Sequence, residues 1–222
     1  MKQAPPKGTG TAARKQLSPR RKPLQQRSMA RSEQILEVTA ALLDQVGFDA
    51  LTTILIARES GISVGTLYHY FPNKHAIMYA MAKQWLREVE RALAEIDGWQ
   101  FATLGPEQFV DALVERQLAV YKAQKGILHL VQAMFSVPEL RALDQQHDAL
   151  VIERMTAAFS RYGLAGSPTE LGRIARCYLE LTHALLLVVV NQAGSRSRRT
   201  LADLKRLTLC LLQPCLEGVH PR

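Results

Sequence analysis

Hydroxyl, imidazole and methyl-bearing side chains are concentrated between Leu51 and Lys74, in the stretch LTTILIARESGISVGTLYHYFPNK. Hydroxyl and imidazole groups can donate hydrogen bonds to phosphate oxygens and to base edges, and methyl groups can touch thymine. A glycine lets the backbone approach a ligand closely. The residues that offer these groups together on a short segment are Val64, Gly65, Thr66, His69 and Tyr70.

Two short helices are predicted to position these side chains. Thr52 is a good N-cap for the first, because its hydroxyl can accept from a free backbone N–H of the first turn. Gly61 ends that helix, since glycine readily adopts the left-handed conformation at the C′ position. Ser63 caps a second helix, Val64–Tyr70. Pro72 ends it, because the residue before a proline disfavours the helical region.

A helix, a short turn containing glycine and a second helix form the pattern of a helix-turn-helix. Ile56 and Ala57 on the first helix, and Leu67 and Phe71 on the second, would face inward. An ordinary corner between two helices has the same pattern, so the spacing alone leaves that alternative open. In a helix-turn-helix the second helix lies in the major groove of DNA, where each base pair presents its own donors and acceptors.

The run Gly61-Ile62-Ser63-Val64-Gly65-Thr66-Leu67-Tyr68-His69-Tyr70-Phe71, followed by Lys74, resembles the DNA-binding domain of TetR-family (tetracycline-repressor-like) transcription regulators. The resemblance spans about Ser28 to Ile77, and the rest of the chain is similar to the family in length and helical pattern. It implies an all-α protein with an N-terminal three-helix helix-turn-helix domain and a helical ligand-binding and dimerisation bundle. We expect residues 1–27 to be a basic disordered arm, 28–75 the DNA-binding domain with its helix-turn-helix at about 52–71, and 76–218 the regulatory domain.

The resemblance also implies residue roles. Tyr68 matches a phosphate-contacting tyrosine, Lys74 matches a phosphate-binding lysine, and Thr52 or Thr53 would bind the DNA backbone. Ile54 and Leu55 depart from the family, because these positions are usually polar and some members carry a DNA-contacting arginine there. The full predicted DNA-binding set is Thr52, Thr53, Ser63, Val64, Gly65, Thr66, Tyr68, His69, Tyr70, Lys74 and Arg27.

Positive charge is concentrated at the N-terminus. The formal net charge is +8, and the Lys and Arg residues before Ser28 account for all of it, since no Asp or Glu precedes Glu33. A basic arm next to a DNA-reading helix suits binding to phosphates with release of counterions or insertion into the minor groove. A disordered solubilising tail is the alternative.

The remaining pattern is helical throughout. A first helix is expected from about Met29 to Val46, ended by Gly47, and Asn73 would cap a long helix that stops at Asp97-Gly98. At ~1.5 Å per residue, that helix is about 35 Å long, enough to join two domains. Further helices are expected at about Pro106–Lys125, Ile127–Phe135, Glu139–Tyr162, Pro168–Ala193 and Leu201–Leu216.

The last two of these helices are apolar over more than one face. Burial in the chain's own core explains part of this pattern, and pairing with a second copy in a four-helix dimer interface would explain the rest. The resemblance implies dimerisation of this kind. The predicted dimer-interface residues are Leu171, Ile174, Tyr178, Leu181, Leu185, Leu204, Thr208 and Leu211.

A small-molecule pocket is expected inside the C-terminal helices, mainly apolar with a few polar groups. The candidate residues are Trp85, Tyr121, His129, Phe135, Tyr178 and His183, and for any single one of them plain core packing is the favoured explanation. The expected function is therefore a DNA-binding regulator, most often a repressor in this family, released by a small apolar effector. The alternative is a regulator or interaction module of the same fold that answers to a partner protein or to no small effector.

Several other classes are disfavoured. The six histidines lack metal-ligand spacing, and no phosphate loop or nucleophile elbow occurs, so we expect no metal, no cofactor and no enzyme. The longest apolar run, Ala184–Val190, is far shorter than the ~20 residues of a membrane span. The cysteines Cys177, Cys210 and Cys215 suit reduced thiols in a cytoplasmic protein.

Overall fold

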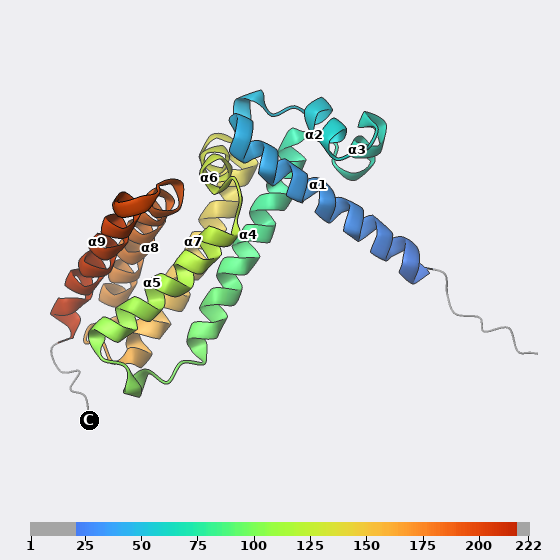
Figure 1. The fold of residues 1–222 in the computed structure, drawn as a ribbon. Helices are drawn as coiled ribbons and strands as arrows, with labels where there is room; N and C mark the ends of the chain where they lie inside the picture. The colour runs from blue at the N-terminus through green and yellow to red at the C-terminus, as the bar shows by residue number, and fades with distance from the viewer. Residues whose placement is uncertain (1–20, 217–222) are drawn as a thin grey trace, which may run out of the picture.

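The computed structural model describes residues 21–216, and every regular element among them is a helix. Figure 1 shows a small group of helices at one end, α1 (Arg21–Ala50), α2 (Thr53–Glu59) and α3 (Val64–Tyr70), and a larger bundle formed by the rest of the chain. The all-α prediction is confirmed.

Helix α1 begins earlier than the sequence pattern indicated. It starts at Arg21 rather than near Met29, and its first turns extend away from the body of the molecule (Figure 1). No apolar stripe marks these turns, so the hydrophobic periodicity could not reveal them. Residues 1–20 of the predicted basic arm lie outside the described residues, whereas 21–27 belong to this helix. Gly47, with φ 73°, interrupts the helical geometry at the predicted stop.

The small core beneath α3 is built as the inward-facing pattern predicts. Ile35 from α1, Ile56 from α2 and Leu67 from α3 are fully buried, and Leu51 closes the core between α1 and α2. Burying side chains of this size stabilises the fold by roughly 1.5–3 kcal/mol each. Gly61, with φ +64°, makes the turn between α2 and α3.

A long helix, α4 (Lys74–Asp97), joins this core to the bundle. Asn73 caps it by accepting from the backbone N–H of Ala76, as predicted. Gly98 ends it. At its C-terminal end the Asp97 carboxylate pairs with Arg154 at 2.6 Å and with Arg161 at 3.0 Å, so this end of α4 is tied to α7.

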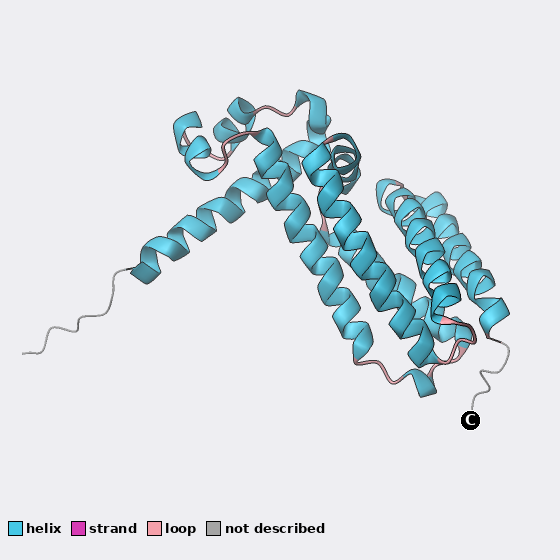
Figure 2. Ribbon diagram, turned by 180° about the vertical axis from the view of Figure 1, so that it is seen from behind, coloured by secondary structure: helices cyan, strands magenta, loops and turns pink. Residues whose placement is uncertain are grey.

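The bundle is completed by five further α-helices. They are α5 (Pro106–Ala123), α6 (Ile127–Ser136), α7 (Pro138–Tyr162), α8 (Pro168–Asn191) and α9 (Gly194–Leu212), with short 3₁₀ turns at Phe101–Thr103 and Gln213–Cys215. In Figure 2, α4 and α7 run side by side along the molecule, and α8 and α9 form a pair at the opposite edge from α1.

The expected start of α9 was wrong. We predicted a loop from Gly194 to Arg199, but those residues form the first turns of the helix. Serine and arginine are compatible with a helix, and the segment has no apolar residue to reveal its phase before Leu201. The Ser197 hydroxyl donates to the Val189 carbonyl at 2.9 Å, which secures this turn to α8.

Helix α8 is the one helix of the described part that is long and apolar enough, by length and composition, to cross a membrane. Its stripe of buried residues, including Leu171, Ala175 and Leu186, packs inside the bundle. Its main neighbours are α7 and α9. Core helices of bundles commonly show this composition, and this packing accounts for part of the apolar character of α8.

Candidate nucleic-acid interface and effector pocket

Helix α3 presents its N-terminal residues to solvent on a firmly capped turn. The Ser63 hydroxyl accepts from the backbone N–H of Thr66 at 3.0 Å, and the two hydroxyls lie 2.9 Å apart. Gly65 and Thr66 are exposed, and Val64 is half-buried. The N-terminus of this helix is therefore free to approach a groove, with backbone N–H groups that attract an anion.

Leu67 is the residue of α3 that anchors it to the core, and Tyr68 and His69 face solvent. The Tyr68 hydroxyl lies 3.2 Å from the Thr53 hydroxyl, so one can donate to the other. This pair links α3 to the first turn of α2 on the outer surface. Two hydroxyls held together in this way suit a single phosphate group.

Lys74 has partners inside the chain. Its ammonium donates to the Phe48 carbonyl at 2.9 Å and lies 4.1 Å from the centre of the Phe48 ring. An ammonium has three donors, so one hydrogen bond leaves capacity for a phosphate. The contact also ties the first residue of α4 to the loop that follows the main part of α1.

A shallow groove separates the start of α1 from the end of α3. It is lined by Arg27, Arg31 and Gln34 on one side and by His69 and Tyr70 on the other. The sequence pattern singled out Arg27, but Arg31 was missed because the expected helix gave no reason to separate it from other exposed arginines. Ile54 on α2 is 68% exposed, which leaves an apolar side chain on the outer surface of this helix.

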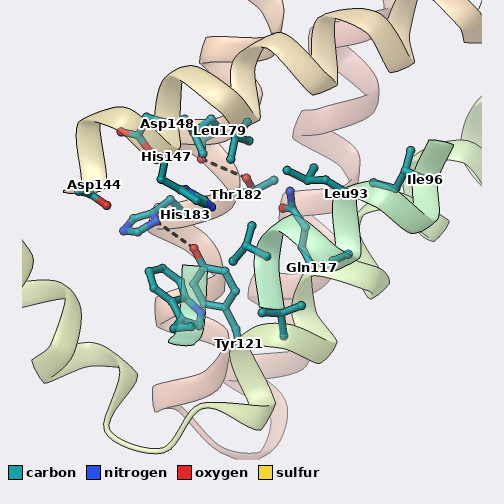
Figure 3. A pocket seen from close by; sticks show the side chains of 15 residues that line it. Leu93, Ile96, Gln117, Tyr121, Asp144, His147, Asp148, Leu179, Thr182 and His183 are labelled. Atoms are coloured by element: carbon teal, nitrogen blue, oxygen red, sulfur yellow. Dashed lines mark hydrogen bonds between the residues drawn. The ribbon is translucent and has the colours of Figure 1, made fainter. Parts of the chain in front are cut away.

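Four helices of the bundle enclose a narrow pocket (Figure 3). Its cavity volume is about 30 Å³, and about 530 Å³ when all the space between the lining atoms and the open solvent at its mouth is included. Helix α4 contributes Trp85 and Leu93, α5 contributes Gln117 and Tyr121, and α8 contributes Thr182 and His183. The side that α7 contributes is ionisable, with Asp144, His147 and Asp148.

His183 lies among aromatic side chains in this pocket. Its Nδ1 is 2.9 Å from the Tyr121 hydroxyl, and its ring packs edge-on against Tyr121 and Phe135. Trp85 also packs edge-on against Tyr121, with ring centres 5.6 Å apart. Burial lowers the pKa of His183, although the charge of Glu180 opposes this, so the imidazole favours its neutral form.

The α7 residues are ionisable groups in a poorly solvated site. Burial, followed by the charges of Asp144 and Glu180, raises the pKa of Asp148 to about 6, with Arg176 opposing. Burial and Glu180 likewise raise the pKa of Asp144. Burial lowers the pKa of His147 to about 4, and a hydrogen bond to the Leu86 backbone offsets only part of this effect.

The structure sorts the predicted ligand residues. Trp85, Tyr121 and His183 line the pocket. His129 lies elsewhere, near Gly47 and bonded to Gln132, and Tyr178 is packed in the core against Phe159. Phe135 touches His183 but is largely exposed and is not part of the lining.

Asp144, His147 and Asp148 were missed by the sequence analysis. Their spacing of three and four residues places them on one face of a helix, and that spacing was the available signal. Within residues 21–216, no group of three or more His, Cys, Asp or Glu side chains is arranged to hold a metal ion.

The predicted dimer residues divide into two groups. Leu171, Ile174, Tyr178, Leu204 and Thr208 are buried inside the chain's own core, with at most 3% of their surface exposed, so they cannot form a surface for a second copy. Their helical repeat is the inward stripe, which a sequence pattern cannot distinguish from an outward one. Leu181, Leu185 and Leu211 are half-buried, and Leu207 on α9 is exposed.

Family models match both parts of the chain. The model described as "Bacterial regulatory proteins, tetR family" matches residues 35–81. The model described as "Tetracyclin repressor-like, C-terminal domain" matches residues 106–212. The first covers the helix-turn-helix and the second covers α5 to α9.

Individual relatives agree with these models. The chain is 26% identical over 106 residues to the HTH-type transcriptional regulator BetI of Vibrio campbellii, covering 48% of this chain and 53% of that protein. It is 28% identical over 141 residues to the HTH-type transcriptional repressor KstR of Mycolicibacterium smegmatis, covering 63% and 66%. The chain thus spans about half the length of the curated relatives that it matches first.

Solved structures show the same arrangement over most of the chain. A TetR-family transcriptional regulator from Streptomyces coelicolor superposes with a TM-score of 0.58 at 26% identity, covering 84% of this chain and 99% of that one. GusR of Salmonella enterica superposes with a TM-score of 0.63 at 23% identity, covering 83% and 96%. Both family models and the solved structures match the helix-turn-helix and the C-terminal bundle of this chain. The chain belongs to the TetR family of regulators.

Proposed function

We propose that this protein is a homodimeric DNA-binding transcription regulator in the cytoplasm. It acts as a repressor that leaves a palindromic operator when a small molecule occupies the pocket between α4, α5, α7 and α8. The observation that carries the proposal is the exposed, capped N-terminus of α3. Leu67 anchors this helix to the core while its N-terminal residues stay on the surface.

The α3 surface suits the major groove of double-stranded DNA. Val64 and the Thr66 methyl group can contact thymine methyls, and His69 can donate to base edges. Tyr68 with Thr53, Lys74 and Arg27 surround this helix with groups for phosphate. Phosphate contacts fix the register of the protein on the duplex, and base contacts provide the sequence preference.

A two-fold dimer supplies the second reading helix. One α3 contacts only a few base pairs, and pairing doubles the site, with half-sites about 34 Å apart on one face of the duplex. The outer apolar residues of α8 and α9, including Leu181, Leu185, Leu207 and Leu211, are the surface that we assign to the second copy.

The pocket suits an effector because α4 lines it and also begins at the DNA-binding domain. Trp85 and Leu93 come from the same helix as Lys74, which holds the Phe48 carbonyl. A ligand that favours a conformation with the wrong spacing of the two α3 helices must weaken DNA binding by the same coupling factor.

Selection from random duplexes tests DNA reading directly. The purified full chain should enrich a palindromic sequence, and Thr66→Ala with His69→Ala should weaken binding to that sequence by at least about tenfold. Glu153→Gln, an exposed change on α7, serves as the matched control and should bind normally. Failure to enrich any sequence would overturn the DNA-reading proposal.

Light scattering during gel filtration tests the dimer. The chain has a mass of 24.8 kDa, so the proposal predicts about twice that value in solution. Leu207→Glu adds a charge to an exposed site on α9 and should produce the monomer without unfolding it. A stable dimer in this variant would place the interface elsewhere.

The alternative is a regulator that is controlled by a partner protein or that has no small-molecule effector. Ligand binding to the native state raises its melting temperature by mass action, so a thermal-shift screen of small molecules separates the two. Stabilisation that is lost when Tyr121 and His183 are replaced would support the effector. If an operator is selected but no small molecule raises the melting temperature, the result would support the alternative.

A further inference from the structure

Two carboxylates at the pocket have no cationic partner in the described part of the chain. Asp144 and Asp148 lie one helical turn apart on α7, and both are half-buried. None of the ion pairs among residues 21–216 includes either of them. Arg176 on α8 acts on Asp148 through space, but Glu180 on the same helix adds a third negative charge. The pocket therefore has an excess of negative charge on one side.

A buried acceptor lies beside these carboxylates. His147 is 8% exposed and lines the same pocket, and its Nε2 has no hydrogen-bond partner among residues 21–216. Figure 3 shows His147 beside Asp144 and Asp148 on the α7 side of the pocket. A neutral imidazole with its proton on Nδ1 can accept at Nε2. An unpartnered polar atom at such depth costs free energy until something pairs with it.

The opposite walls are apolar and aromatic. Trp85, Leu93 and Val120 face the space across from the α7 side chains, and Tyr121 adds a ring. A compact hydrocarbon body can lie against these residues. Aromatic rings also attract a nearby cation through their negative faces.

We propose that this pocket binds a small protonated organic amine, with its N–H groups held by Asp144, Asp148 and the Nε2 of His147 and its apolar body against Trp85 and Leu93. Binding of the amine does not depend on the proposed function. The expectation that the amine releases DNA rests on it. A neutral apolar molecule would leave two carboxylates facing it without a cation, and an anion would be repelled. A quaternary ammonium would satisfy the charge but could not donate to His147.

Three probes that share one skeleton test the class of ligand. Calorimetry at pH 7.5 on the full chain would compare 2-phenylethylamine, 2-phenylethanol and 2-phenylethyl-trimethylammonium. The amine should bind at least about tenfold more tightly than the alcohol, the size of one charge-assisted hydrogen bond. The quaternary cation should fall between them. Equal binding of the amine and the alcohol, or no binding of the amine at millimolar concentration, would overturn the proposal.

Variants then assign the binding to these residues. Asp144→Asn with Asp148→Asn should reduce the affinity for the amine by at least about tenfold and leave that for the alcohol unchanged. His147→Phe should reduce the affinity for the amine and leave the affinity for the quaternary cation unchanged. Glu153→Gln removes an exposed carboxylate from the same helix and should change nothing. Undiminished amine binding by the double variant, folded by circular dichroism, would refute the assignment.

Operator binding separates this proposal from the general function. If the selected duplex binds but the amine neither binds nor releases it, the amine inference fails and the regulator proposal stands. If the amine binds through the two aspartates but no duplex is ever selected, the pocket assignment stands and the regulator proposal fails.

Discussion

The helix-turn-helix and the bundle pocket use polar side chains in opposite ways. Around α3 the polar groups are exposed, and the nearest ones satisfy one another, as Ser63 with Thr66 and Thr53 with Tyr68 do. In the pocket they are buried or half-buried, and His147 Nε2 is left without a partner. The difference fits the proposed roles, since a DNA-binding surface can be preformed in the free chain, whereas an effector pocket can offer an unpaired acceptor to its ligand.

The largest expected effect comes from removing the one fully buried side chain of α3. Leu67→Ala should destabilise the helix-turn-helix by about 3 kcal/mol, because Leu67 is fully buried in a small core. Hydrogen exchange should show lost protection in α2 and α3 with little change around the pocket. Ile54→Ala, at a 68% exposed site, should change stability by less than about 0.5 kcal/mol. Equal loss in both regions would show that the two parts unfold as one unit.

Two glycines with nearly equal φ angles allow the packing of the two regions to be compared. Gly61 has φ +64° and open space around it, whereas Gly126 has φ +65° and an added Cβ would lie 2.9 Å from the Ala40 carbonyl oxygen of α1. Gly61→Ala should cost about 1 kcal/mol from backbone strain alone. Gly126→Ala should cost roughly 1–3 kcal/mol more, because α1 or α6 must shift. Urea unfolding measures both, and equal costs would mean that α6 moves away from α1 easily.

The cap of α3 separates stability from DNA contact. Ser63→Ala should destabilise α3 by about 1 kcal/mol, because the Thr66 backbone N–H loses its acceptor. Ser63→Asp keeps an acceptor and should preserve stability, yet its negative charge should repel phosphate and weaken operator binding. Thermal denaturation and duplex titration measure the two quantities. Normal operator binding by Ser63→Asp would place DNA away from the start of α3.

The smallest expected effect is a pH-dependent one in the pocket. The folded chain raises the pKa of Asp148 from its ordinary 3.8 to about 6, so ionisation costs stability. The cost is absent below the ordinary value, grows as pH rises between the two values, and is complete above the folded value. Asp148→Asn should therefore raise the melting temperature at pH 8 by roughly 2 °C, because solvent screens a half-buried charge, and by much less at pH 4. A constant difference across this range would show that another group controls the titration.

Local signals in the sequence predicted the helix-turn-helix to within a residue. Thr52, Ser63 and Asn73 cap their helices, and Gly61 makes the turn, because capping depends on residues three or four positions apart. The pocket depends on which face of α7 meets α4 and α8. Asp144 and His147 have spacing that any solvent-facing helix also shows, so the chain alone could not assign them to a cavity.

The apolar stripes of α8 and α9 illustrate the same limit. Their period was predicted correctly, but Leu171, Leu204 and Thr208 point into the chain's own bundle rather than at a second copy. Periodicity specifies that a face is apolar and does not specify its neighbour. Deciding between the two required the packing of α8 against α7 and α9.

Helix α4 is fastened at both of its ends and bordered by the pocket between them. Lys74 holds it to the Phe48 carbonyl at the first residue, and Asp97 holds it to Arg154 and Arg161 at the last. A helix held at both ends in this way resists sliding and fraying when a ligand presses against Trp85 near its middle. We therefore expect α4 to bend or to rotate as a rigid body. The loop at Phe48 would then move together with the first turn of α4.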